Sequence, residues 1–511
     1  MTVRLWIDVE DLFEYVRGNH RRPTGIQRMA FEIYRELQAR YANTGLVQFV
    51  RHSLASTRFQ VVTWTEVVTL FNGLVTNETV DTTQTSRIAV TPVLSNLPAR
   101  LLVRRLAYRL TPSLRSNVVD ALVTQGRAFR SWGRLLSALA REIARMSLKV
   151  TLLSESGADN QYSCRVSEIS FADFAAPGDI LLMLGATWSH PDYGGLLQRE
   201  CKANGLRFAL LIYDLIPLRC PEWCDHLVVR DFRKWIDRVL PLSDVVFAIS
   251  RATASDVTSY AQEQGIALPG SIITLPIGSE LRRQPELPSD RLPSPGTYAL
   301  IVSTVEARKN HLLLFRVWRR MLEEMPREHV PTLVFAGKIG WLVADLMQQI
   351  ANTDNLSGKL VLIESPSDAD VAALYDGCLF TLFPSFYEGW GLPVTESLAF
   401  GKPCLIADRT SLPEAGGILV RRFDPDNLND AYAVVRNVIE DQDGRTRWEA
   451  QIRREFRSVP WSATVDTLLA GLGHPLVTSH ADAQLMDMLG GSRTQELSDA
   501  AIWGQDIEHA E

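Results

Sequence analysis

Short, continuous apolar runs recur along this sequence and alternate with stretches whose apolar residues follow a helical period. The first run is Arg4–Val9, and the later ones in the first half are Ile180–Leu184, Leu206–Leu215, Val245–Ile249 and Ile272–Leu275. Between them, Gly25–Tyr41 predicts a helix with one apolar face, formed by Ile26, Met29, Ala30, Ile33 and Leu37. Runs without alternation are typical of strands buried on both faces of a parallel sheet. The pattern therefore predicts an α/β fold.

The pattern stops at residues 281–297, a segment rich in proline and charge with no periodicity, and then starts again. We interpret this segment as a linker between two domains of the same class, residues 1–280 and 298–455. Two such domains place a cleft between them, which is where small ligands usually bind. The expected strands of the second domain are Ala299–Ser303, Leu333–Ala336, Leu360–Ile363, Phe380–Phe383 and Pro403–Ile406.

Two segments depart from the pattern. Residues 98–150 carry eleven Arg or Lys side chains against two acidic ones, with leucines and aromatics interleaved at helical spacing. Basic amphipathic helices of this kind lie on anionic membrane surfaces, although helices packed on the first domain with a solvated basic face would give the same pattern. We favour membrane contact. Residues 473–511 are acidic and weakly periodic, which predicts a mobile tail.

The overall composition argues against several classes of protein. The chain has 511 residues, 46% of them hydrophobic, and a formal net charge of −6, which gives no indication of nucleic-acid binding. An acidic residue stands where a signal peptide would still be apolar, and no apolar run reaches about 18 residues. We therefore expect a cytoplasmic protein, peripheral on the inner face of the cytoplasmic membrane if it binds one. The six cysteines lack zinc-site spacing, so neither a metal site nor a disulfide is expected.

The strongest candidate for chemistry is the segment Phe383–Leu398, which predicts a strand, a glycine-rich loop and a helix. Gly389 and Gly391 would let the backbone approach a ligand, and a helix N-terminus after such a loop is a natural phosphate site. Glu388 on the loop and Glu396 in the helix could each accept two hydrogen bonds from a vicinal diol. From the residues alone, a loop with solvated glutamates remains the alternative.

The spacing of these glutamates in PSFYEGWGLPVTESLAFGKP resembles the E-x7-E signature of the family 4 glycosyltransferases, or glycosyl transferases group 1. The resemblance covers residues 3–50 and 178–472. It implies the GT-B fold, in which two Rossmann-like parallel-sheet domains face each other across a cleft and a C-terminal helix, here 456–472, crosses back to the first domain. Further motifs in the family's order are Arg21–Arg28, Ile249–Thr253, Glu306–His311, Ala336–Trp341 and Ser411–Glu414.

The resemblance also implies roles for individual residues. Glu388 would contact hydroxyls of the donor sugar, Glu396 would bind the ribose diol, and Lys309 with its neighbour would stabilise the charge on the departing diphosphate. The implied catalytic residues are Lys309, Arg308, Glu388 and Asp214. The implied donor-binding residues are Gly25, Gly389, Trp390, Gly391, Leu392, Glu396 and Lys338. The implied acceptor-side residues are Tyr213 and Trp188.

At two positions the chain departs from the family pattern. Many members have Gly-Arg after the first strand of the second domain, where this chain has Ser303-Thr304, and Arg308 is a candidate replacement. Many have His-Asp where this chain has Tyr213-Asp214, so no histidine role is carried over. For Asp214, capping of the next turn is an equally good interpretation, and Trp188 could be a platform for a sugar or a core residue.

The function implied is a retaining hexosyltransferase that uses a nucleotide-sugar donor, with GDP-mannose as the first candidate. The acceptor would be a saccharide or a lipid-linked saccharide in surface polysaccharide synthesis. Cofactors are not expected. The departing phosphate oxygen would serve as base, and Lys309, Arg308 and the helix N-terminus would take the place of a metal ion. Two alternatives stay open: another enzyme on the same fold, such as a sugar-nucleotide epimerase, and a catalytically silent assembly protein.

Overall fold

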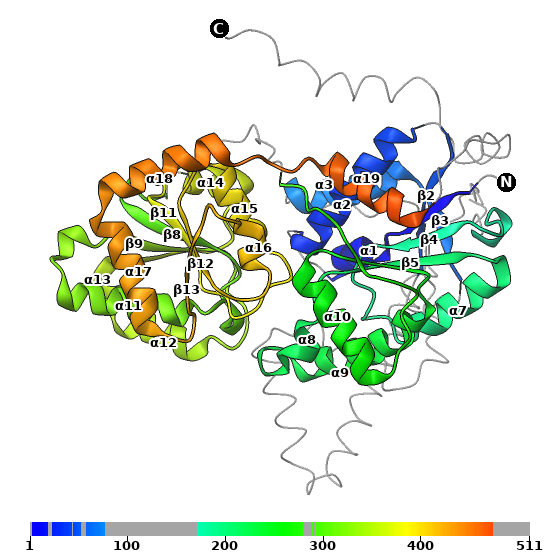
Figure 1. The fold of residues 1–511 in the computed structure, drawn as a ribbon, viewed down its shortest axis with the longest axis horizontal. Helices are drawn as coiled ribbons and strands as arrows, with labels where there is room; N and C mark the ends of the chain where they lie inside the picture. The colour runs from blue at the N-terminus through cyan, green and yellow to red at the C-terminus, as the bar shows by residue number, and fades with distance from the viewer. Residues whose placement is uncertain are drawn as a thin grey trace, which may run out of the picture. The chain divides into compact units, whose positions relative to one another are not determined.

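The computed structural model describes residues 3–18, 23–42, 44–52, 58–76, 171–279, 288–289 and 292–473. The basic segment 98–150, the predicted tail after its first residue, and residues 281–287 and 290–291 of the predicted linker lie outside the described residues. The predictions for the basic segment and the tail are therefore untested. Within the described residues the chain forms two separate, mainly parallel β-sheets, each flanked by helices (Figure 1). The predicted class, α/β with two Rossmann-like parallel-sheet domains, is confirmed.

The first sheet has seven strands in the order β3-β2-β1-β4-β5-β6-β7, all parallel except β3, which runs antiparallel to β2. Its strands are β1 (Leu5–Asp8), β2 (Val47–Arg51), β3 (Gln60–Val62), β4 (Ile180–Met183), β5 (Arg207–Ile212), β6 (Val245–Ala248) and β7 (Ile273–Thr274). Its helices are α1 (Glu10–Arg17), α2 (Gly25–Arg40), α3 (Trp64–Thr76), α7 (Tyr193–Asn204), α8 (Ile216–Arg219), α9 (His226–Val239) and α10 (Arg251–Gln264).

Neighbouring residues of β1 belong to two different hydrophobic cores. Leu5 and Ile7 pack in one cluster, whereas Trp6 packs in another, and all three are fully buried. This is the expected consequence of side chains that alternate between the two faces of a strand when both faces are covered. The continuous apolar runs of the sequence are thereby explained.

The second sheet has six parallel strands in the order β10-β9-β8-β11-β12-β13. Its strands are β8 (Tyr298–Val302), β9 (Thr332–Ala336), β10 (Leu360–Ile363), β11 (Phe380–Phe383), β12 (Cys404–Ala407) and β13 (Arg421–Phe423). Its helices are α11 (His311–Glu324), α12 (Ala344–Asn352), α13 (Asp354–Gly358), α14 (Asp368–Gly377), α15 (Leu392–Ala399), α16 (Leu412–Gly416), α17 (Leu428–Glu440) and α18 (Gln442–Glu455). The order places β8 and β11 side by side, so the loops that follow them meet at one edge.

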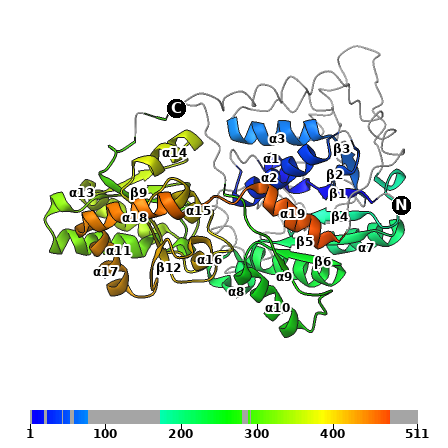
Figure 2. The ribbon, with the colours of Figure 1, turned by 45° about the horizontal axis from the view of Figure 1, so that its top comes forward.

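The last helix, α19 (Trp461–Leu472), packs on the first sheet although it follows the second in sequence (Figure 2). Trp461 and Val465 belong to the same hydrophobic cluster as α2. A Cβ added at Gly278 would lie 2.2 Å from the Trp461 ring, so glycine allows this close approach. Among the described residues no helix has the length and apolar character needed to cross a membrane.

Candidate functional site

The loop between β11 and α15 is held in place by hydrogen bonds to the residues after β12. Thr410 accepts a hydrogen bond from the Glu388 N–H at 3.0 Å, and the Ser411 hydroxyl lies 2.8 Å from each of the Glu388 and Trp390 carbonyl oxygens. Helix α15 begins at Leu392, directly after this loop. The serine and threonine were missed as site residues, although Ser411 opens one of the quoted motifs.

Both glycines of this loop are required by the protein's own packing. A Cβ at Gly389 would lie 2.3 Å from the Tyr213 carbonyl oxygen, and one at Gly391, whose φ is 110°, would lie 2.8 Å from Leu412. Close approach to a ligand is therefore unnecessary to explain them. Among the described residues we find no acceptor for the N–H groups of residues 389–392, which leaves a row of donors at the start of α15.

Arg308, Lys309 and Glu388 come together at the edge where β8 and β11 end. Glu388 Oε1 lies 2.5 Å from Lys309 Nζ, and Oε2 lies 3.0 Å from Arg308 Nη1. Each of the three side chains is less than a fifth exposed. The alternative of solvated glutamates is therefore wrong for Glu388, and these three predicted catalytic residues form one cluster.

The turn that carries Arg308 and Lys309 is fixed by a neighbour that the sequence analysis did not single out. Asn310 adopts the left-handed conformation, with φ 55°, between the short 3₁₀ helix Ala307–Lys309 and α11. Its buried side-chain amide donates to the carbonyl oxygens of Pro384 and Pro425, at 3.3 and 3.1 Å. Asn310 thus joins the turn after β8 to the loop after β11, and its presence inside the quoted motif was the available signal.

The cluster keeps Glu388 ionised. Burial opposes ionisation, but the charge of Lys309, and then that of Arg308, outweighs it and lowers the pKa of Glu388 to about 2. Burial likewise opposes the charge on Arg308, yet Glu388 and Glu306 raise its pKa above the ordinary value. Arg308 Nη2 also lies 2.7 Å from Oε1 of buried Glu306, so the two basic side chains, Arg308 and Lys309, face two carboxylates, those of Glu388 and Glu306.

Ser303 and Thr304, which replace the family's Gly-Arg, lie at the end of β8 against the end of β9. The Ser303 hydroxyl is 3.3 Å from Nε2 of buried His311, and a Cβ at Gly337 would lie 2.1 Å from the Ser303 carbonyl oxygen. Burial, and then the charge of Lys309, lower the pKa of His311 to about 3. The imidazole is thus neutral, and the cations on this side come from Arg308 and Lys309.

Glu396 lies on the second turn of α15 and is half-buried. The Tyr375 hydroxyl donates to its Oε2 at 2.9 Å. Burial raises the pKa of Glu396, although this hydrogen bond works in the opposite direction. The carboxylate is oriented by a neighbour rather than solvated, and Tyr375 was missed by the sequence analysis.

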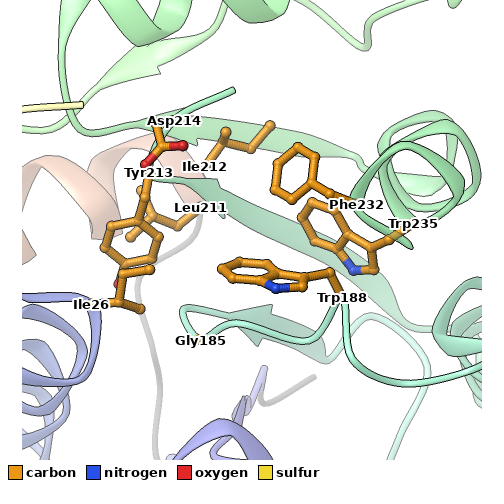
Figure 3. A pocket seen from close by; sticks show the side chains of 9 residues that line it. All are labelled: Ile26, Gly185, Trp188, Leu211, Ile212, Tyr213, Asp214, Phe232 and Trp235. Atoms are coloured by element: carbon orange, nitrogen blue, oxygen red, sulfur yellow. The ribbon is translucent and has the colours of Figure 1, made fainter. Parts of the chain in front are cut away.

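In the first domain, Tyr213 and Asp214 follow β5. The Tyr213 hydroxyl donates to the Leu184 carbonyl oxygen at 2.6 Å, so only the ring of Tyr213 faces the neighbouring hollow (Figure 3). Asp214 Oδ1 accepts a hydrogen bond from the Ile216 N–H at 3.0 Å, which is the capping role considered for it. Burial raises the pKa of Asp214, while this hydrogen bond and Arg308 lower it.

Trp188, the other predicted acceptor-side residue, lines the same hollow (Figure 3). Its ring is half-buried and lies 5.5 Å from that of Phe232 and 6.0 Å from that of Trp235, measured between centroids. The structure therefore brings Trp188, Tyr213 and Asp214 to one place, at the carboxyl ends of β4 and β5. This is the edge where ligands bind in α/β sheets.

Gly25 and Lys338 complete the predicted set. Gly25 is the first residue of α2, whose start is fixed by Gln27, and the Gln27 amide donates to Asp11 Oδ2 at 2.8 Å. A Cβ at Gly25 would lie 3.6 Å from Leu392, an ordinary contact. Lys338 follows β9 and is exposed, so the structure does not bring its side chain into the cluster around Glu388. Asp11 was missed by the sequence analysis.

In the part of the chain that the structure describes, no group of three or more His, Cys, Asp or Glu side chains could hold a metal ion. The cysteines at 201, 220, 224, 378 and 404 are free.

Comparison with known proteins gives a family for the second domain. Residues 283–455 match the family model described as Glycosyl transferases group 1. The serotype-specific mannosyltransferase WbdA of Escherichia coli is 28% identical over 222 residues, which are 40% of this chain and 26% of that protein. The O-antigen chain mannosyltransferase B of Escherichia coli is 25% identical over 275 residues, 52% of this chain and 70% of the relative. The resemblance inferred from the motifs is confirmed.

The chain thus spans only about a quarter of the length of WbdA. Among solved structures, the crystal structure of TarM aligns over 58% of this chain and 55% of its own, with 13% sequence identity and a TM-score of 0.44.

Proposed function

We propose that this chain, whose residues 283–455 form a domain of the glycosyl transferases group 1 family, is a retaining hexosyltransferase that uses a nucleotide-sugar donor. One observation carries the proposal: two cations, Lys309 and Arg308, converge on Glu388 beside the unpaired N–H groups at the start of α15. Cations and a helix N-terminus together suit a diphosphate. Ionised Glu388 between them suits the hydroxyls of the sugar attached to it.

The chemistry follows from the charges. When the bond between the sugar C1 and the phosphate oxygen breaks, negative charge grows on the diphosphate, and Lys309 and Arg308 stabilise it. The acceptor oxygen bonds to C1 on the face that the diphosphate leaves, and its proton passes to the departing phosphate oxygen. Glu388, with a pKa of about 2, holds no proton to donate and stays a hydrogen-bond acceptor. This mechanism retains the anomeric configuration.

Glu396 fits the role of ribose clamp in this proposal. The Tyr375 hydroxyl donates to one carboxylate oxygen of Glu396, Oε2. Glu396 lies within two helical turns of the N–H groups at the start of α15, which would bind the diphosphate. A ribose diol beside the diphosphate could therefore donate to the acceptor positions of Glu396 that Tyr375 leaves free. No metal ion is assigned a role.

For the donor we propose mannose from GDP-mannose. Its support is that two relatives are named as mannosyltransferases. For the acceptor we propose a saccharide or lipid-linked saccharide of a surface polysaccharide, on the cytoplasmic face of the membrane, with the basic residues 98–150 in contact with anionic lipid. Binding to anionic vesicles that is lost in high salt would support this location.

The test is incubation of the purified full chain with each of several nucleotide sugars and a panel of saccharide acceptors. We expect one donor to give a glycosylated product by mass spectrometry, with the donor's anomeric configuration by NMR. An inverted product would overturn the retaining mechanism. Conversion of the nucleotide sugar without any acceptor product would favour an epimerase instead, and no reaction with any donor would favour a silent assembly protein.

A further inference from the structure

We propose that the hollow beside Trp188 binds the methyl group of an acceptor sugar, so that the acceptor is a 6-deoxyhexose residue. This inference rests on the proposed transferase function and names the acceptor class for it. The hollow has a volume of about 300 Å³, part of it open to solvent. Its lining residues are Ile26, Gly185, Trp188, Leu211, Ile212, Tyr213, Asp214, Phe232 and Trp235 (Figure 3).

The walls of the hollow are apolar and aromatic. Trp188 lies across one side, Phe232 and Trp235 close a second, and Ile26 with the Tyr213 ring closes a third (Figure 3). The two indoles and the phenyl ring contact one another at centroid distances of 5.3 to 6.0 Å. Aromatic faces of this kind bind the C–H groups of a sugar and leave its hydroxyls unpaired wherever no polar partner is present.

Most polar atoms around the hollow are already bonded within the protein. The Tyr213 hydroxyl is used by the Leu184 carbonyl at 2.6 Å, and Trp235 Nε1 donates to the Thr187 hydroxyl at 3.0 Å. Asp214 Oδ1 is used by the Ile216 N–H. The indole nitrogen of Trp188 is on the edge of its ring that faces away from Asp214 (Figure 3).

This leaves Asp214 Oδ2 at the rim as the acceptor for a bound sugar, since among the described residues we find no hydrogen bond to it. One ring hydroxyl can donate to it while the group on C5 enters the apolar interior. A methyl group there loses nothing, whereas a hydroxymethyl group would lose its hydrogen bonds to water without replacement. The hollow therefore discriminates against the oxygen on C6.

The test compares two acceptors that differ by that one oxygen, an alkyl α-L-rhamnoside and the matching α-L-mannoside, and repeats the comparison with an α-L-fucoside and an α-L-galactoside. With the donor that the assay on the full chain selects, we expect kcat/KM to be at least about tenfold higher for the 6-deoxy member of the accepted pair. Equal or higher efficiency for the hydroxylated member overturns the inference. The inference is also overturned if the enzyme glycosylates other acceptors but neither member of either pair. Failure of the proposed function looks different, because no acceptor of any kind is then glycosylated.

Two variants assign the preference to this hollow. Trp188→Ala removes one wall, and we expect the ratio between the paired acceptors to fall toward one while the KM for the donor is unchanged. Ile26→Thr keeps the β-branch, removes the terminal methyl group and adds a hydroxyl that can pair with the oxygen on C6, so the ratio should fall severalfold without loss of folding. The inference is wrong if both folded variants keep the wild-type ratio.

Discussion

Lys309 Nζ lies 2.5 Å from Glu388 Oε1, although 79 residues separate them in the sequence. They meet because β8 and β11 are neighbours in the second sheet and run parallel, so that the loops after both strands lie at the same edge. Arg308 joins the pair from the same turn as Lys309. The ion pair between Lys309 and Glu388 thus follows from the strand order.

Replacing Glu388 by glutamine should reduce kcat/KM for transfer about 100-fold, with a folded protein. The amide has nearly the shape of the carboxylate but cannot balance the two cations or accept two hydrogen bonds from the sugar. Steady-state kinetics would measure the effect. Glu323→Gln is a matched control, because Glu323 is 64% exposed and, among the described residues, pairs only with Arg319 on its own helix at 3.4 Å. A similar loss in both variants would contradict the assignment.

The contact between Tyr375 and Glu396 predicts a binding effect and little effect on chemistry. In Tyr375→Phe the 2.9 Å hydrogen bond is lost but the carboxylate remains. The KM for the donor should therefore rise severalfold with kcat nearly unchanged, since a ribose clamp acts equally in ground and transition states. Glu396→Gln should raise the donor KM further. If kcat falls and the donor KM does not move, Glu396 does not bind the ribose.

Two glycine substitutions should separate packing from ligand contact. In Gly389→Ala the new Cβ would lie 2.3 Å from the Tyr213 carbonyl, so we expect the free energy of unfolding to fall by about 1–3 kcal/mol. In Gly25→Ala the nearest atom lies 3.6 Å away, so stability should be kept while the donor KM rises if the donor passes this helix start. Urea denaturation measures the change in stability, and steady-state kinetics measures the donor KM. A loss of stability in Gly25→Ala with none in Gly389→Ala would contradict this account.

Asp11 predicts a dependence of stability on pH. Burial raises its pKa from 3.8 to about 7, so the folded state holds the proton more tightly than the unfolded state. Its contribution is then fully present below pH 4 and is lost as the pH rises to about 7, by up to about 4 kcal/mol. Asp11→Asn, which still accepts the Gln27 hydrogen bond, should be less sensitive to pH over this range. Urea titrations at pH 4.5 and 7.5 test this, with exposed Asp173→Asn as the control.

The central strands of both sheets could be predicted because each is a continuous apolar run buried on two faces. Two of the four edge strands, β7 and β10, were also predicted from apolar runs. β13, which contains two arginines, and β3, which is short and runs antiparallel, lack the length and apolar pattern of a central strand and were not predicted. β2 lies inside the sheet but includes Gln48, which interrupts its apolar run. The run Leu206–Leu215 proved too long, since its last three residues form the turn that carries Asp214.

The site was predictable only in part, because several of its contacts join residues that are far apart in the sequence. Motif spacing could identify Glu388 and Glu396 and, through the family resemblance, Lys309. The pairing of Lys309 with Glu388 depends on which strands are neighbours, and the role of Asn310 depends on two carbonyls from distant loops. Local patterns contain neither kind of information. Gly389 shows the opposite case, because a glycine expected to face a ligand faces the backbone of Tyr213.

The central claim is that Lys309, with Arg308 and the start of α15, binds the diphosphate of the donor. Calorimetric titration of the wild type, Lys309→Ala and the exposed control Lys202→Ala with GDP and with UDP measures this directly. We predict that one of the two nucleotides binds the wild type and the control alike and binds Lys309→Ala at least about tenfold more weakly, a difference of about 1.4 kcal/mol or more. Equal affinity of Lys309→Ala and the wild type for that nucleotide would contradict the account.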